Sequence, residues 1–155
     1  MKAMKIISSM AVLALLICFS LPASAKVAVP VNVFGQAGDG AITDENYTQV
    51  LPNGTNQIFT LPTNKMLIFS SIFVSFSTTT PFTPPVKFVI EDANGDSPSI
   101  FAWNLSPNQS NTNASLDFTF QPGLALSVKP VMKVVDSSNN VVSGTLKVRV
   151  FGIVQ

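Results

Sequence analysis

The segment at residues 65–77, KMLIFSSIFVSFS, constrains the fold more than any other part of this chain. Every second residue is apolar with one serine as the exception, and the residues between them are apolar at the start of the segment and mostly serine toward its end. Side chains on a β-strand point to opposite faces with a period of two, so one face can be buried fully and the other only in part. Its apolar run is too short to span a bilayer and is interrupted by serines, which disfavours a membrane helix. The sequence therefore predicts a central strand with one fully buried face. That face is expected to carry Met66, Ile68, Ile72, Val74 and Phe76, interrupted only at Ser70.

The first 25 residues have the three parts of a secretory signal peptide. Lys2 and Lys5 give a positive start, residues 6–21 are apolar, and Ala23-Ser24-Ala25 supplies small residues for cleavage. A retained membrane anchor is the competing interpretation, but the apolar stretch is at the short end for spanning a bilayer. We therefore expect an exported mature chain at residues 26–155, in a periplasm or outside the cell.

Length, charge and cysteine content bound the mature chain further. It would hold 155 − 25 = 130 residues, which is the size of a single domain with its own core. Removing Lys2 and Lys5 leaves seven basic residues against eight acidic ones, a net charge of 7 − 8 = −1, without a basic patch. Nucleic acid is therefore not an expected partner, and neither is stable membrane insertion of the mature chain. Cys18 leaves with the signal peptide, and export without cysteine is more typical of a bacterial protein than of a disulfide-stapled eukaryotic one.

Short alternating segments separated by turn residues fill the mature chain. No stretch has a helical period with capping residues, so we predict an all-β fold: an antiparallel β-sandwich, jelly-roll-like, of about eight to ten strands. A β-barrel is the alternative. Pro30 cannot donate a backbone hydrogen bond, which places the first strand at a sheet edge, and Pro122-Gly123 is expected to reverse the chain between two strands. The expected strands are residues 26–34, 47–51, 57–61, 65–77, 86–91, 99–105, 116–120, 124–129 with a continuation at 131–135, and 144–154.

The available side chains argue against an enzyme. The chain has no histidine, and its only cysteine lies in the signal peptide. Ser-His-Asp and Cys-His catalysis and most zinc sites are therefore excluded. Asp44-Glu45 and Glu91-Asp92 are adjacent pairs, whose side chains would point to opposite faces of a strand rather than toward one substrate. We therefore expect a non-enzymatic protein without a bound cofactor.

One turn has oxygen ligands at alternate positions. Asp92, Asn94 and Asp96 lie within the segment DANGD, and oxygen ligands in a turn suit a hard cation such as calcium. The rest of the EF-hand pattern is missing. Asn94-Gly95 is also the strongest hairpin signal in the chain, because both central positions of a type I′ turn need positive φ. The plain hairpin is the simpler interpretation, and calcium is the alternative.

A second candidate site combines an aromatic side chain with amides. If Trp103 is exposed, it would stack on a sugar ring while Asn104 and Asn108, in the amide-rich segment that follows, bind hydroxyl groups. The competing interpretation packs Trp103 in the core with Phe101 and Leu105, because the three share strand parity and tryptophan is usually buried.

Two classes of function fit these observations. The first is a secreted binding module for a glycan or another surface ligand. The second is a structural or assembly subunit of an extracellular or surface layer, in which the first strand leaves its own sheet and completes that of a neighbour. Pairing of that strand within its own domain is the alternative to exchange.

Overall fold

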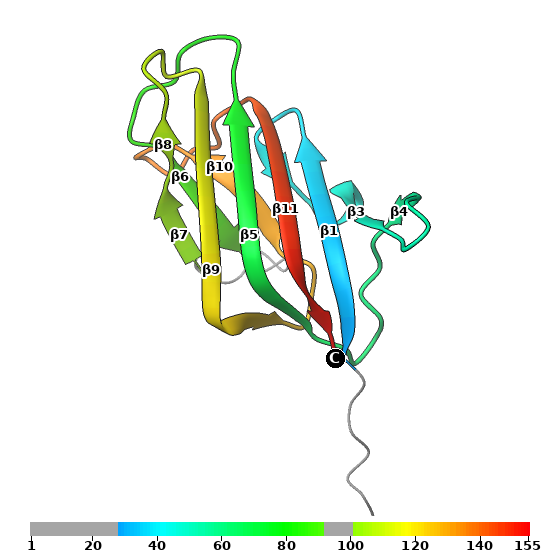
Figure 1. Ribbon diagram of the computed structural model, residues 1–155. Helices are drawn as coiled ribbons and strands as arrows, with labels where there is room; N and C mark the ends of the chain where they lie inside the picture. Colours follow the sequence, from blue (N-terminus) through cyan, green and yellow to red (C-terminus); the bar gives the residue numbers. More distant parts are fainter. Residues whose placement is uncertain (1–27, 92–100) are drawn as a thin grey trace, which may run out of the picture.

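The computed structural model describes residues 28–91 and 101–155. The expected signal peptide and the candidate calcium ligands Asp92, Asn94 and Asp96 lie outside the described residues. The described chain is all-β, with one 3-10 turn, η1 (Asp44–Asn46), and two antiparallel sheets that face each other as a sandwich (Figure 1). Across residues 28–91 and 101–155 we find no helix with the length and apolar character to cross a membrane.

The larger sheet has seven strands with the two ends of the described chain near its middle (Figure 1). The first and last strands pair along nine residues, from Val29 opposite Val154 to Ala37 opposite Leu146. Both outer strands are short, which limits the backbone that is open to edge-to-edge pairing. In spatial order the strands are β4 (Asn56–Ile58), β3 (Tyr47–Val50), β1 (Val29–Ala37), β11 (Thr145–Val154), β5 (Leu67–Ser77), β9 (Asn113–Leu126) and β8 (Ser106–Pro107).

The smaller sheet has four strands, in the order β2 (Ala41–Ile42), β10 (Val131–Val135), β6 (Lys87–Glu91) and β7 (Phe101–Asn104). β6 and β7 pair antiparallel on either side of the Asn94-Gly95 signal. Eleven strands are therefore present in the described residues, slightly more than the eight to ten expected, because the two-residue strands β2 and β8 have no pattern of their own.

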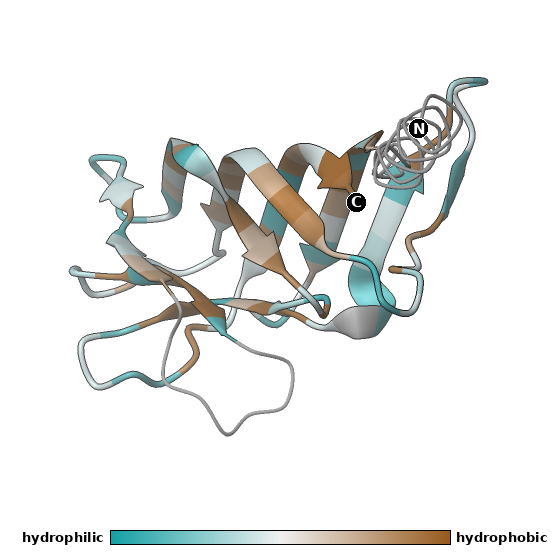
Figure 2. Cartoon of the chain, turned by 90° about the horizontal axis from the view of Figure 1, so that it is seen from below, coloured by the Kyte–Doolittle hydropathy of each residue, from teal (hydrophilic) through white to brown (hydrophobic). Residues whose placement is uncertain are grey.

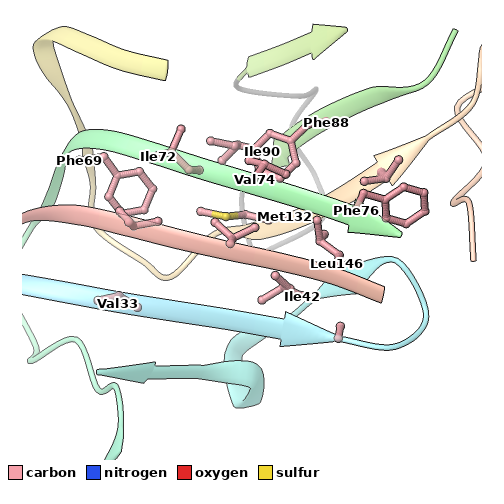
Figure 3. Packing of buried hydrophobic residues seen from close by; sticks show 14 of the residues in the cluster. Val33, Ile42, Phe69, Ile72, Val74, Phe76, Phe88, Ile90, Met132 and Leu146 are labelled. Atoms are coloured by element: carbon pink, nitrogen blue, oxygen red, sulfur yellow. The ribbon is translucent and has the colours of Figure 1, made fainter. Parts of the chain in front are cut away.

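The core lies between the two sheets, which Figure 2 shows edge-on as separate layers. Side chains from both layers interdigitate there (Figure 3). Among the described residues the buried side chains are apolar apart from the hydroxyl group of Tyr47, so hydrophobic burial dominates this interface. The labelled core residues are Val33, Ile42, Phe69, Ile72, Val74, Phe76, Phe88, Ile90, Met132 and Leu146.

The central strand is confirmed as β5, but its predicted division into faces is wrong in the first half. Met66 and Ile68 were expected in the core, whereas Met66 is exposed and the buried residues are Leu67 and Phe69. The alternation changes phase at Ser70, where the pairing with both neighbouring strands shifts register. An extra residue at a β-bulge moves every following side chain to the other face. Ile72, Val74 and Phe76 are consequently buried on the same side as Leu67 and Phe69.

Glycines on both neighbouring strands accommodate this bulge. A Cβ on Gly152 of β11 would lie 2.2 Å from the carbonyl oxygen of Ile68, and one on Gly123 of β9 would lie 2.8 Å from that of Phe69. Both distances are far below van der Waals contact. The two glycines therefore allow the backbones to approach β5 where it bends.

Two further expectations differ from the structure. The chain does not reverse at Pro122-Gly123: β9 continues through it, and both halves pair with β5 across an irregular register. β1 does not form a sheet edge, because it lies between β11 and β3. The missing N–H of Pro30 is nevertheless tolerated as it would be at a sheet edge. β3 pairs only with Val33–Gly35, so among the described strands the residues around Pro30 pair with β11 alone.

Candidate functional site

The outer face of the seven-stranded sheet is hollowed. The hollow, which we call the outer-face pocket, has a volume of about 740 Å³, within the range of ligand sites. β3 and β4 supply one side, β5 and β11 supply the other, and β1 lies between them. Its lining is formed by Phe34, Gly35, Gln36, Asn46, Thr48, Val50, Asn56, Phe73, Val74, Ser75, Lys147, Val148 and Arg149.

Strand alternation explains how an apolar core and a mixed outer face arise from the same strands. On β11, Val148 and Val150 point into the core, so Lys147 and Arg149 point outward. On β5 the residues after the bulge obey the same rule, which brings Phe73 and Ser75 to the outer face. Phe73 is 44% exposed, an unusual environment for a large aromatic side chain.

Aromatic rings hold the guanidinium group of Arg149 in place. Its carbon atom Cζ lies 5.0 Å from the ring centre of Phe34 and 4.7 Å from that of Phe151, both within cation–π distance. Its Nε donates a hydrogen bond of 3.2 Å to Oδ1 of Asn32. Phe151 in turn contacts Phe73 edge-to-face, with ring centres 6.0 Å apart. The position of Arg149 is therefore set by three side chains, and within residues 28–91 and 101–155 no hydrogen bond or ion pair uses its terminal amino groups.

Polar side chains surround these rings. Gln36 and Asn56 are exposed amides, Asn46 and Thr48 are half-buried, and Ser75 is exposed. Amides and hydroxyls both donate and accept hydrogen bonds. The pocket thus combines aromatic surface with hydrogen-bonding groups and two cations, and the described residues that line it include no carboxylate.

The structure places Trp103 elsewhere, in an aromatic cluster between β7 and β9. Its ring stacks on that of Phe101 at 5.3 Å and 8°, and it contacts Phe118 at 4.9 Å and Phe120 at 5.8 Å. Trp103 is half-buried and packs against the core. The exposed ring at this edge is that of Phe101, which is 38% exposed.

The structure does not bring the predicted amides together around Trp103. Asn104 follows Trp103 on β7 and is exposed, so the two side chains lie on opposite faces of the strand. The side chain of Asn108 is used within its own loop: Nδ2 donates to Oγ of Ser110 at 2.9 Å, and Oδ1 accepts from the N–H groups of Thr112 and Asn113 at 3.0 and 3.1 Å. Asn108 therefore stabilises the loop that leads into β9.

The described residues hold no group of three or more His, Cys, Asp or Glu side chains that could bind a metal ion. Lys133 and Glu91 form an ion pair of 2.8 Å between β10 and β6. This pair bridges neighbouring strands of the smaller sheet and lies apart from the outer-face pocket.

Sequence reasoning missed the outer-face pocket for two reasons. Alternation places Phe73 opposite the predicted core face but does not identify its neighbours on other strands. Two of the side chains around Arg149 come from residues 32 and 34, at the other end of the chain. One local signal was present: Lys147, Arg149 and Phe151 alternate with core valines on a strand, a pattern that places two cations and an aromatic ring on one face.

Comparisons with models of protein families, with curated proteins and with solved structures give no match for this chain.

Proposed function

We propose that this chain is an exported, non-enzymatic β-sandwich module, jelly-roll-like in arrangement, that binds a glycan in the outer-face pocket. The observation that carries the proposal is the exposed ring of Phe73 beside the fixed group of Phe34, Arg149 and Phe151. A sugar ring has apolar faces and a rim of hydroxyl groups. Aromatic surface complements those faces, and the amides of Gln36 and Asn56 complement hydroxyl groups.

Trp103 supports this function less well than the pocket does. Its ring faces are occupied by Phe101 and neighbouring aromatics, so a sugar would have to displace packing contacts to reach it. Phe73 has one edge-to-face contact and a large exposed surface.

The test is titration calorimetry of the chain at residues 26–155 with a panel of neutral and acidic oligosaccharides, for the wild type, Phe73→Ala and Phe101→Ala. Both variants remove an exposed phenylalanine, but Phe101 lies on the other sheet. We expect Phe73→Ala to weaken binding about tenfold, equivalent to about 1.4 kcal/mol, and Phe101→Ala to bind as the wild type does. If no oligosaccharide binds at millimolar concentration, or if only Phe101→Ala weakens binding, the proposal is wrong.

An assembly subunit is the second candidate, and one feature favours it. Among the described strands, β11 alone pairs with the part of β1 before Val33, and the other edge of this part borders a hollow of about 460 Å³. Val29 and Ile58 line that hollow and are 53% and 67% exposed. An added strand would cover these side chains and complete the backbone pairing. Within the described chain, β1 pairs with β11 and β3 of its own domain.

Light scattering coupled to size-exclusion chromatography tests this candidate. An assembly through the open edge should dissociate in Ile58→Lys, because a charge there opposes strand addition. If the wild type is a monomer at all concentrations, this chain is not an assembly subunit.

A further inference from the structure

From the charge of the outer-face pocket we infer the class of its ligand: an acidic polysaccharide, with a carboxylate on its sugar units that Arg149 binds through two hydrogen bonds. This inference rests on the proposed glycan-binding function and specifies the class of glycan that is bound.

Two positive charges lie together in the pocket among neutral neighbours. Lys147 and Arg149 are two residues apart on β11 and share its outer face. Strand pairing places Gln36 and Ser75 on either side of Lys147, and Phe34 and Phe73 on either side of Arg149. All four neighbours are neutral, although opposite charges at such positions would stabilise the sheet.

No acidic side chain of the described chain neutralises these two cations. Neither has an ion pair among residues 28–91 and 101–155, and Lys147 has no hydrogen bond there either. Asp117 faces the same side, but it is paired with Phe73 on the far side of β5. It therefore lies two strands from Arg149, about 10 Å at the usual strand spacing. The positive charge is local, since the mature chain expected from the sequence has a net charge of 7 − 8 = −1.

The guanidinium group of Arg149 is already oriented for a ligand. Its Cζ lies within cation–π distance of the rings of Phe34 and Phe151, and its Nε donates a hydrogen bond to Oδ1 of Asn32. The two terminal amino groups remain, and they form the planar fork that binds both oxygens of a carboxylate. A guanidinium already held in place loses little side-chain entropy when it binds.

The rest of the pocket distinguishes a sugar acid from other anions. The carboxylates of an acidic peptide would pair with Lys147 and Arg149. Such a peptide offers no apolar ring face for the exposed ring of Phe73 and no row of hydroxyl groups for the amides of Gln36 and Asn56. A hexuronic acid unit carries a carboxylate, several hydroxyl groups and an apolar ring face together. Its chemistry matches all three parts of the pocket.

The experiment compares three probes on the chain at residues 26–155: a hexamer of galacturonic acid, the same hexamer with its carboxylates reduced to primary alcohols, and hexaglutamate. We expect the acidic hexamer to bind at least tenfold more tightly than the reduced one, and hexaglutamate to bind more weakly than the acidic hexamer. Affinity for the acidic hexamer should fall as salt rises, because screening weakens the charge contacts.

Variants then test how Arg149 and Lys147 contribute to binding of the acidic hexamer. Arg149→Lys keeps the charge but loses the fork, and should weaken binding of the acidic hexamer about tenfold. Lys147→Gln should weaken it severalfold, and the matched control Lys87→Gln, which removes the same charge from the other sheet, should have no effect. Thermal melts establish that each variant is folded.

The outcomes separate the two proposals. Equal affinity for the acidic and reduced hexamers overturns the acidic ligand but leaves glycan binding standing. Equal affinity for hexaglutamate, or equal losses in Lys147→Gln and Lys87→Gln, means charge attraction without sugar recognition and also overturns the inference. Absence of binding by both hexamers and by the full oligosaccharide panel refutes the glycan-binding function itself.

Discussion

Replacing Gly152 by alanine tests the structural account of the central strand. A Cβ at this position would lie 2.2 Å from the carbonyl oxygen of Ile68, 3.1 Å from its carbonyl carbon and 3.3 Å from Cα of Phe69. A carbon–oxygen contact in sheets is normally about 3.3 Å or longer. β11 and β5 would therefore have to separate by about 1 Å at the bulge, at the usual contact distance.

The expected loss of stability follows from that displacement. Neither strand can swing away freely, because β11 is held by β1 and β5 is held by β9 on their other sides. Overpacking of this kind costs about 1–3 kcal/mol, and stretched ladder hydrogen bonds contribute about 1 kcal/mol more. We therefore expect Gly152→Ala to lower the free energy of unfolding by about 3 kcal/mol. For a domain of this size that corresponds to a fall in Tm of about 12 °C.

Gly38→Ala is the matched control. A Cβ added at Gly38 would have no heavy atom within 4 Å, and the residue has no positive φ, so alanine fits there. Such a substitution changes stability by less than about 1 kcal/mol and in favour of the folded state. Calorimetric melts of both variants at one pH provide the measurement. If Gly152→Ala melts within about 2 °C of Gly38→Ala, which corresponds to well under 1 kcal/mol, the close approach of β11 to the bulge is wrong.

Two further predictions concern single hydrogen-bonding groups. The buried hydroxyl of Tyr47 donates to the carbonyl oxygen of Pro130 at 2.7 Å, so Tyr47→Phe should lower the free energy of unfolding by about 1–3 kcal/mol in urea titrations; an unchanged midpoint would contradict this contact. The pKa of Asp136 lies below its ordinary value because its carboxylate accepts hydrogen bonds from the backbone N–H and side-chain amide of Asn140 and from the N–H of Ser138. A lowered pKa gives stability that is present above the unfolded-state pKa and is lost as pH falls through the folded-state pKa. Asp136→Asn should therefore be less stable than wild type at pH 6 and match it in strong acid, as measured by urea titration; a difference independent of pH would exclude this origin.

The all-β class and the positions of most strands follow from local patterns in the sequence. Alternation with a period of two and turn residues between the runs are local properties, and they identify β3, β5, β6 and β11 with small shifts of their ends. Residues 131–135 are predicted as a continuation of residues 124–129, but they form the separate strand β10 in the other sheet. Two of the missed features are strands of two residues, β2 and β8, which are too short to carry a pattern.

Which side of a strand is buried, and which side chains lie together on the exposed side, depends on the tertiary structure. Ser70 changes the phase of β5 because Gly152 and Gly123 let neighbouring backbones bend with it, and both glycines lie far from Ser70 along the chain. Pairing of the first strand with the last brings Phe34 and Asn32 to Arg149. A local pattern cannot specify such contacts, because they depend on strand order and register, which are set by packing of the whole sheet.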